Sequence, residues 1–247
     1  MMNLKNKSPE RPDPAEGPEA RFSQAELSKV VEACRSLPPA QGDYRADDYV
    51  LNLIITVLDF RMHAGVLNKA LDHFCLGPGR RIVTHRQLAE HLDAFPESKQ
   101  GGADLALSLW GYRYWTRAAL LRKLLGYFDQ RSIRDLEALR RWARGADFER
   151  DFRGRIPGLG YAVFQWLIMR LGVEAVKPDT HLKHFLMQTA GRKFGDGDAS
   201  ALMLEAARQL AMPALDFDTR LWESVRRQKG RRGGGEVKYL GRNRERH

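Results

Sequence analysis

The sequence is poor in cysteine and has no long apolar segment. Cys34 and Cys75 are the only cysteines among its 247 residues, too few for the disulfide framework that stabilises small secreted domains. The longest apolar run lies around residues 53–58 and is far shorter than the ~20 residues of a membrane-spanning helix. Residues 1–20 lack the apolar stretch of a signal peptide. We therefore expect a cytoplasmic protein with reduced thiols and no contact with a membrane.

Strand-like alternation is also scarce. The best example, Arg81-Ile82-Val83, is too short for a β-strand. Apolar residues recur instead at helical spacing, which predicts an all-α protein. Ser23 and Glu26 form the pattern of a capping box, so a helix is expected from there to about Leu37. The segment that begins at Val50 is apolar on nearly every side and predicts a buried helix.

The other helices follow from the same periodicity of 3.6 residues. They are expected near 64–75, 84–94, 102–110, 114–128, 132–144, 161–171, 181–190, 198–210 and 216–228. Thr84, Ser132 and Thr180 stand where N-caps belong. This length of chain suffices for one large domain or two small ones, each with a buried core.

Positive charge is concentrated at one end of the chain. The formal net charge is +10, and residues 226–247 hold nine Lys or Arg against two Glu. Such a tail suits a polyanion, above all nucleic acid, although a solvated tail that only aids solubility remains the alternative. Residues 1–20 are rich in Pro, Glu and Lys and are expected to be disordered. Residues 21–226 should form the folded part, and 227–247 a basic, flexible tail.

The segment Ile156-Pro157-Gly158-Leu159-Gly160 predicts a tight turn before an apolar helix. Glycines at positions 158 and 160 allow backbone torsions that are closed to other residues. Leu159 can insert into the core and fix the turn. The bare N–H groups of the following helix then favour an anion such as a DNA phosphate. An ordinary connector between two helices is the alternative.

A second turn, Lys177-Pro178-Asp179-Thr180, follows one helix later. Pro178 disfavours helix at Lys177, so Asp179 lies at the start of the next helix, where it could serve simply as an N-cap. Hairpin, helix and aspartate together form one geometric unit. It could hold DNA at the hairpin and place a carboxylate beside a nucleotide drawn out of the duplex.

These two turns resemble the helix–hairpin–helix–Gly/Pro–Asp superfamily of DNA glycosylases, which includes endonuclease III. The family's Leu-Pro-Gly-Val-Gly hairpin corresponds to residues 156–160, and its Val-Asp-Thr-His-like turn to residues 178–181. Segments 51–71, 109–128 and 216–225 resemble further family helices, so the likeness covers about residues 45–226. It implies a two-lobed all-α fold with a DNA-binding cleft between the lobes. One lobe, a helical barrel, would span about 45–175, and the other 21–44 plus 176–226.

The resemblance implies a base-excision-repair enzyme that acts as a monomer on double-stranded DNA with a damaged or mispaired base, nucleoid-associated if the source is bacterial. Asp179 would be the catalytic carboxylate, which stabilises the oxocarbenium-like transition state and orients the attacking water. The family's lyase lysine is replaced by Ala162, and the glutamate of the adenine-mismatch branch by a residue near Val57. Hydrolysis without strand cleavage is therefore expected.

No iron–sulfur cluster or other metal cofactor is expected, because no cysteine follows Cys75; a monovalent cation at the hairpin is compatible with the resemblance. Two alternatives remain open. The chain could be a non-catalytic helix–hairpin–helix DNA-binding protein, or a bifunctional glycosylase and lyase that uses Lys177.

The resemblance also indicates which residues would touch DNA. The predicted DNA contacts are Pro157, Gly158, Leu159, Gly160, Arg61, Met62 and Lys177, with Arg61 and Met62 as the wedge that fills the gap left by a flipped base. The predicted base pocket consists of Asp59, Trp110 and Tyr112. The alternatives are a surface carboxylate for Asp59 and core positions for the two aromatic residues.

Overall fold

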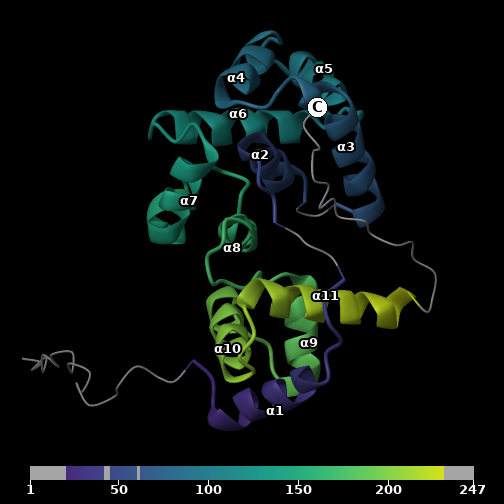
Figure 1. Cartoon of the computed structure of the whole chain (residues 1–247), viewed down its shortest axis with the longest axis vertical. Coiled ribbons are helices and arrows are strands. Elements are labelled where there is room, and N and C mark those ends of the chain that lie inside the picture. Colours follow the sequence, from purple (N-terminus) through teal and green to yellow (C-terminus); the bar gives the residue numbers. More distant parts are fainter. Residues whose placement is uncertain (1–20, 42–44, 60–61, 231–247) are drawn as a thin grey trace, which may run out of the picture.

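The computed structural model describes residues 21–41, 45–59 and 62–230, and within these ranges every regular element is helical, with no strand (Figure 1). The all-α class is thus confirmed. The α-helices are α1 (Gln24–Arg35), α2 (Tyr49–Leu58), α3 (Ala64–Leu76), α4 (His85–Asp93), α5 (Lys99–Trp110), α6 (Trp115–Asp129), α7 (Leu136–Gly145), α8 (Tyr161–Arg170), α9 (Thr180–Ala190), α10 (Asp196–Gln209) and α11 (Ala214–Gly230). A 3₁₀ turn, η1 (Pro78–Arg80), and a π-helical turn, η2 (Phe148–Phe152), complete them. The expected start of the flexible tail at 227 is wrong, because α11 continues to Gly230; the expectations for 1–20 and for 231–247 lie outside the described residues.

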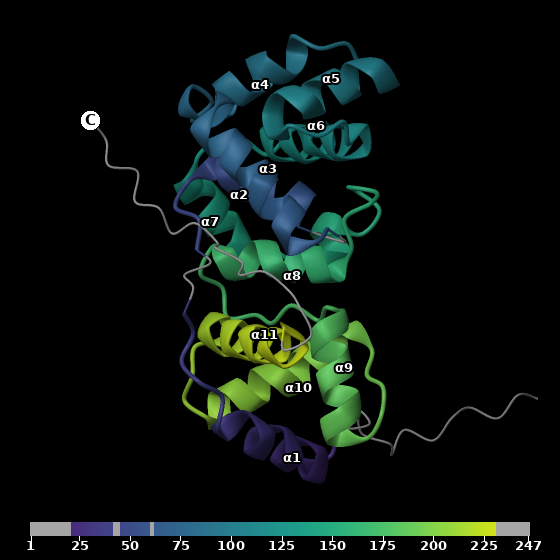
Figure 2. The ribbon, with the colours of Figure 1, turned by 90° about the vertical axis from the view of Figure 1, so that its right-hand side faces the viewer.

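The helices form two groups, each around its own hydrophobic core. The larger core contains buried residues from Ala46 to Ala175, and the smaller one joins α1 to residues between Val176 and Leu221. The chain therefore starts in the smaller group, builds the larger group with α2–α8, and returns with α9–α11 (Figure 1). Turned by 90°, the molecule has α8 and α11 facing each other where the groups meet (Figure 2).

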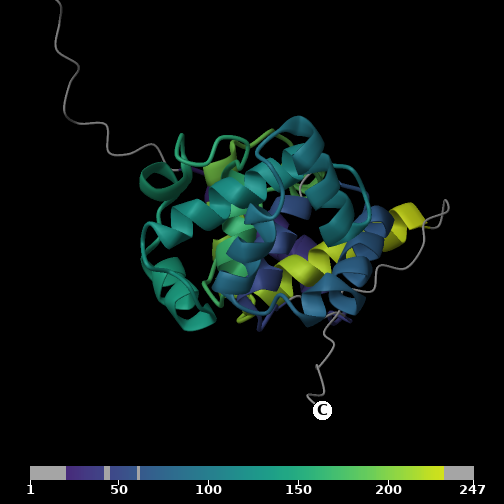
Figure 3. The same cartoon turned by 90° about the horizontal axis from the view of Figure 1, so that it is seen from above.

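Helix α11 runs along this junction. Leu221 belongs to the smaller core, whereas the half-buried Trp222 packs against the larger one. From above, the C-terminal end of α11 extends past the edge of the larger helix group (Figure 3). One helix thus contacts both cores, and its side chains reach the region where the two groups meet.

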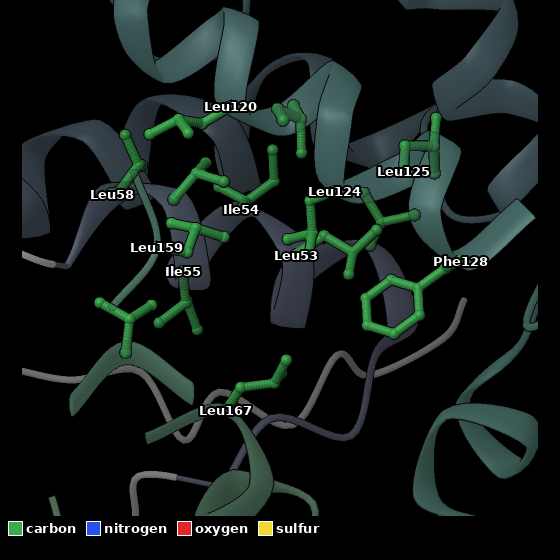
Figure 4. Close-up of a cluster of buried hydrophobic side chains, with 14 of the residues drawn as sticks. Leu53, Ile54, Ile55, Leu58, Leu120, Leu124, Leu125, Phe128, Leu159 and Leu167 are labelled. Carbon is green, nitrogen blue, oxygen red and sulfur yellow. The ribbon is translucent and has the colours of Figure 1, made fainter. Parts of the chain in front are cut away.

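The larger core is built around α2, as its all-round apolar sequence predicts. Leu53 and Ile54 of α2 lie against Leu120 and Leu124 of α6, and Leu159 of the hairpin inserts beside them (Figure 4). Burial of such side chains stabilises the fold by about 1.5–3 kcal/mol each. The hairpin is therefore attached to the most apolar part of the molecule, which fixes its position.

Helix caps decide where several helices begin. Ser23 forms the predicted capping box with Glu26, and Thr84 caps α4 as predicted. The prediction for Ser132 is wrong: its φ is +56°, outside the extended backbone of an N-cap, and the cap of α7 is Asp135, which accepts a hydrogen bond from the Ala138 N–H. Thr180 is likewise not a cap but the first residue of α9.

Candidate functional site

The hairpin at residues 156–160 connects η2 to α8. Ile156 and Leu159 are buried in the larger core, and the Leu159 N–H donates a hydrogen bond of 3.1 Å to the Ile156 carbonyl. Gly158 has a φ of +104°, and a Cβ there would lie 2.8 Å from Leu120 Cδ2. Only glycine suits this position, because other residues rarely adopt this torsion and any side chain would overlap Leu120.

Gly160 has a different role from the one expected. It is the N-cap of α8 with extended backbone (φ −90°, ψ −179°), which any residue adopts, and a Cβ there would meet nothing within 4 Å. The expectation of special torsions is therefore right for Gly158 and wrong for Gly160. No side chain caps α8, and Pro157, Gly158 and Gly160 are exposed. The positive end of the α8 dipole is thus bare beside an exposed turn, an arrangement that suits an anion.

Asp179 is the N-cap of α9. Its Oδ1 accepts hydrogen bonds from the backbone N–H groups of His181 (2.8 Å) and Leu182 (3.0 Å). These bonds and the helix dipole stabilise the negative charge of the carboxylate. Both bonds are accepted by Oδ1, so the cap does not require the second oxygen. The half-buried carboxylate is thus held in one orientation.

Lys177 and Asp59 form an ion pair beside this cap. The Lys177 Nζ lies 2.7 Å from Asp59 Oδ2, and the two side chains are only 18% and 15% exposed. The ammonium group also lies 5.0 Å from the centre of the Trp166 ring, within reach of a cation–π contact. Burial alone would lower the pKa of Lys177, but the neighbouring carboxylates, Asp59 foremost, outweigh it and raise this pKa. Lys177 is therefore a firmly protonated ammonium group at neutral pH.

Asp218 on α11 completes the group of charges and was not singled out from the sequence. Its carboxylate accepts a hydrogen bond from the Lys177 backbone N–H, and burial together with the neighbouring Asp179 carboxylate raises its pKa to about 7. A small hollow beside it holds about 10 Å³ of free space, room for about one water molecule. Its lining comprises Asp179, His181, Leu182, Asp218, Leu221, Trp222 and Val225.

The other predicted site residues differ in how deeply they are buried. Trp110 is fully buried in the larger core, so it packs against its neighbours instead of facing a pocket, and its prediction as a base-pocket residue is corrected to a core role. Tyr112 is half-buried and stacks on Tyr114, which is 42% exposed. Met62 is half-buried against the larger core, and Arg61 lies outside the described residues.

Ala162, in the position of the family's lyase lysine, is half-buried in the first turn of α8. Among the described residues, no three His, Cys, Asp or Glu side chains are arranged to hold a metal ion. No described helix is long and apolar enough to cross a membrane. A separate hollow of about 610 Å³ between α4 and α6 includes none of the predicted site residues.

Comparison with known protein families gives a match to part of the chain. Residues 116–226 match the model of a family described as a domain of unknown function, DUF8548. No curated protein and no solved structure matches the chain. The matched region runs from α6 to α11, so it contains the hairpin, Lys177, Asp179 and Asp218 but not Asp59.

Proposed function

We propose that the protein is a monofunctional DNA glycosylase with the two-lobed fold of the helix–hairpin–helix–Gly/Pro–Asp superfamily, acting as a monomer on duplex DNA in base excision repair. One observation carries the proposal. The hairpin with its bare helix N-terminus and the capping carboxylate of Asp179 stand at opposite ends of one connection, α8 and the turn after it, at the junction of the two helix groups. DNA would lie across this junction.

In this proposal the hairpin binds the DNA backbone. The exposed backbone of Pro157, Gly158 and Gly160 and the bare N–H groups of α8 would contact a phosphate without reading sequence. The damaged or mispaired nucleotide leaves the stack at a cost of a few kcal/mol, which damage or mispairing reduces. Met62, which follows α2 in the chain, and Arg61, which lies outside the described residues, would fill the gap, while Asp59 and Tyr112 would lie near the extruded base.

Asp179 then acts on the sugar. As the bond between the base and C1′ breaks, its electron pair leaves with the base and positive charge develops on the sugar. The fixed Asp179 carboxylate stabilises that charge, and water adds to C1′ while its proton passes to the carboxylate. The hollow beside Asp179, with its 10 Å³ of free space, offers room for such a water.

Two features favour hydrolysis over strand cleavage. Ala162 offers no amine at the position that would attack the sugar. Lys177, the nearest lysine to Asp179 in the sequence, is held as an ammonium group by Asp59, and a protonated amine is not a nucleophile. A bifunctional mechanism through Lys177 is thus disfavoured by the charges that surround it.

A non-catalytic DNA-binding protein is the second candidate. It is favoured by the N-cap bonds of Asp179, which give this residue a structural reason to be present without any chemistry. The two candidates make opposite predictions for the same assay.

The decisive experiment is a panel of duplexes, each with one lesion or one mismatch, incubated with the full chain and then treated with or without alkali. We expect base release from at least one duplex, visible as strand breaks only after alkali. The Asp179→Asn variant should release none. Tight binding to damaged duplexes with no base release from any of them would support the non-catalytic candidate and overturn the glycosylase.

A further inference from the structure

Asp218 joins α11 to the turn before α9. It belongs to α11, it accepts a hydrogen bond from the backbone N–H of Lys177, and it lines one hollow together with Asp179. A hydrogen bond inside the turn also stabilises it: the Asp179 N–H donates to the Lys177 carbonyl at 2.8 Å. Asp218 thus holds the residue that leads into Asp179.

Side chains from α2, from the turn before α9 and from α9 itself lie near Asp218. Lys177 and Asp179 face it from the turn before α9, and His181 faces it from the first turn of α9. Asp59 adds its charge from the end of α2, and Trp222 of α11 itself supplies an apolar wall. The Lys177 ammonium group thus lies near three carboxyl groups and is in direct contact with that of Asp59.

We propose that Asp218 is a positioning residue for Asp179: it accepts a hydrogen bond from the Lys177 backbone N–H and so fixes the turn that holds the Asp179 carboxylate beside the shared hollow. The hydrogen bond from Lys177 and the hollow shared with Asp179 are features of the structure itself. The effect of Asp218 on catalysis rests on the proposed glycosylase function.

The carboxyl groups of Asp179 and Asp218 have unequal surroundings. Asp179 accepts two N–H bonds at the positive end of α9, and these stabilise its negative charge. Asp218 has an apolar wall and a carboxylate neighbour, and together they raise its pKa to about 7. Asp218 therefore carries a proton below about pH 7 and a negative charge above it.

The protonation of Asp218 is tested by ¹³C NMR of the aspartate carboxyl groups in the full chain, titrated from pH 4 to pH 9. We expect one carboxyl resonance with a midpoint near 7, and its loss in Asp218→Asn. Midpoints below about 5.5 for every carboxyl resonance of the wild-type chain would overturn the proposal, and that result needs no variant to fold.

Asp216 provides the matched control. It stands two residues earlier on α11 and pairs with Arg220 at 2.7 Å, with its side chain 33% exposed. Asp216→Asn should leave the resonance with the midpoint near 7 in place. If the resonance is lost in Asp216→Asn and kept in Asp218→Asn, it belongs to Asp216, and the proposal is overturned.

The effect on catalysis is tested with any duplex from which the protein releases a base. Above pH 7 the ionised Asp218 repels the Asp179 carboxylate and displaces it from its position beside the sugar, so the single-turnover rate of the wild type should fall about threefold or more by pH 8.5. Asp218→Asn should show a flat profile over this range, and Asp218→Glu should restore the decline. Identical profiles for the wild type and Asp218→Asn would overturn the positioning role. If no duplex releases a base, the glycosylase function fails, while the NMR titration still decides whether Asp218 is protonated below about pH 7.

Discussion

The ammonium group of Lys177 and the carboxylate of Asp59 are in contact at 2.7 Å although 118 residues separate them. Asp59 is the C-cap of α2, in the larger helix group, and Lys177 follows Val176, a residue of the smaller core. The ion pair therefore joins the two groups at the place where Asp179 lies. Neither group contains the complete cluster of charges by itself.

The Lys177–Asp59 pair should stabilise the fold measurably. Lys177→Met removes the ammonium group that contacts the largely buried Asp59 carboxylate, so we expect a loss of about 3 kcal/mol in the free energy of unfolding. The double variant with Asp59→Asn should lose less than the sum of the single variants, as measured by urea unfolding. The more exposed pair Lys183–Asp196 (2.6 Å) is the control, with an expected coupling below about 1 kcal/mol. Equal coupling for the two pairs would contradict this reading.

No covalent adduct should form between the protein and DNA under borohydride. The carboxylates around Lys177 raise its pKa above the ordinary value of 10.5. The charge is therefore kept at every pH below this value and lost only as the pH rises through it. At pH 7 the amine is unavailable for a Schiff base. An adduct that appears with the wild type and disappears in Lys177→Ala would refute this prediction and support a lyase.

Asp179→Asn should abolish base release but leave duplex binding within about threefold, because the carboxylate acts on the transition state and not on the bound substrate. Asparagine caps helices about as well as aspartate, so the unfolding midpoint should change little. Asp135→Asn, at the N-cap of α7, is the matched control and should keep full activity. Base release by Asp179→Asn at the wild-type rate would remove Asp179 from the mechanism.

The two hairpin glycines should respond differently to alanine. Gly158→Ala forces a residue with a side chain to a φ of +104° and into Leu120, so we expect a loss of about 1–3 kcal/mol in stability. Gly160→Ala has an allowed backbone and open space, so it should change stability by less than about 1 kcal/mol. Thermal unfolding checks both, and equal destabilisation by the two variants would contradict the described hairpin.

Removal of residues 231–247, which contain six Lys or Arg, should weaken duplex binding at low salt. Each phosphate contact that is lost reduces the log–log salt slope by about 0.9. Base release at saturating enzyme should stay the same, because the hairpin and Asp179 lie outside the deleted segment. A salt slope that does not change on truncation would leave solubility as the role of this segment.

Local patterns predicted the helices well and the interactions between them poorly. The capping box of Ser23 and the apolar sides of α2 depend on neighbouring residues, so both could be predicted from the sequence. The π-helical turn η2 is too short to show the 3.6-residue apolar repeat of an α-helix, so the sequence did not predict it. Ser132 looked like a cap because its residue type suits one, but its left-handed backbone does not.

Only part of the site could be predicted from the sequence, because local patterns do not report contacts between distant residues. Asp179 and the hairpin stand out because a turn needs particular residue types. Asp218 does not, because its importance arises from the packing of α11 against the turn before α9, a contact between distant parts of the chain. The burial of Trp110 in the core is equally non-local, since an aromatic residue at helical spacing suits either a core or a binding surface.

The smaller core includes α1, which packs against α9 and α10. Helix α1 ends at Arg35, and α9 begins at Thr180. During synthesis at about 5–20 residues per second, roughly 7–30 seconds pass between the emergence of these helices from the ribosome. Throughout that interval the apolar side of α1, with Leu27, Val30 and Val31, has no native partner. Helices α2–α8 can fold during this interval. The nascent chain then has an exposed apolar side on α1, N-terminal to the folded larger group, and this side could be bound transiently by a chaperone.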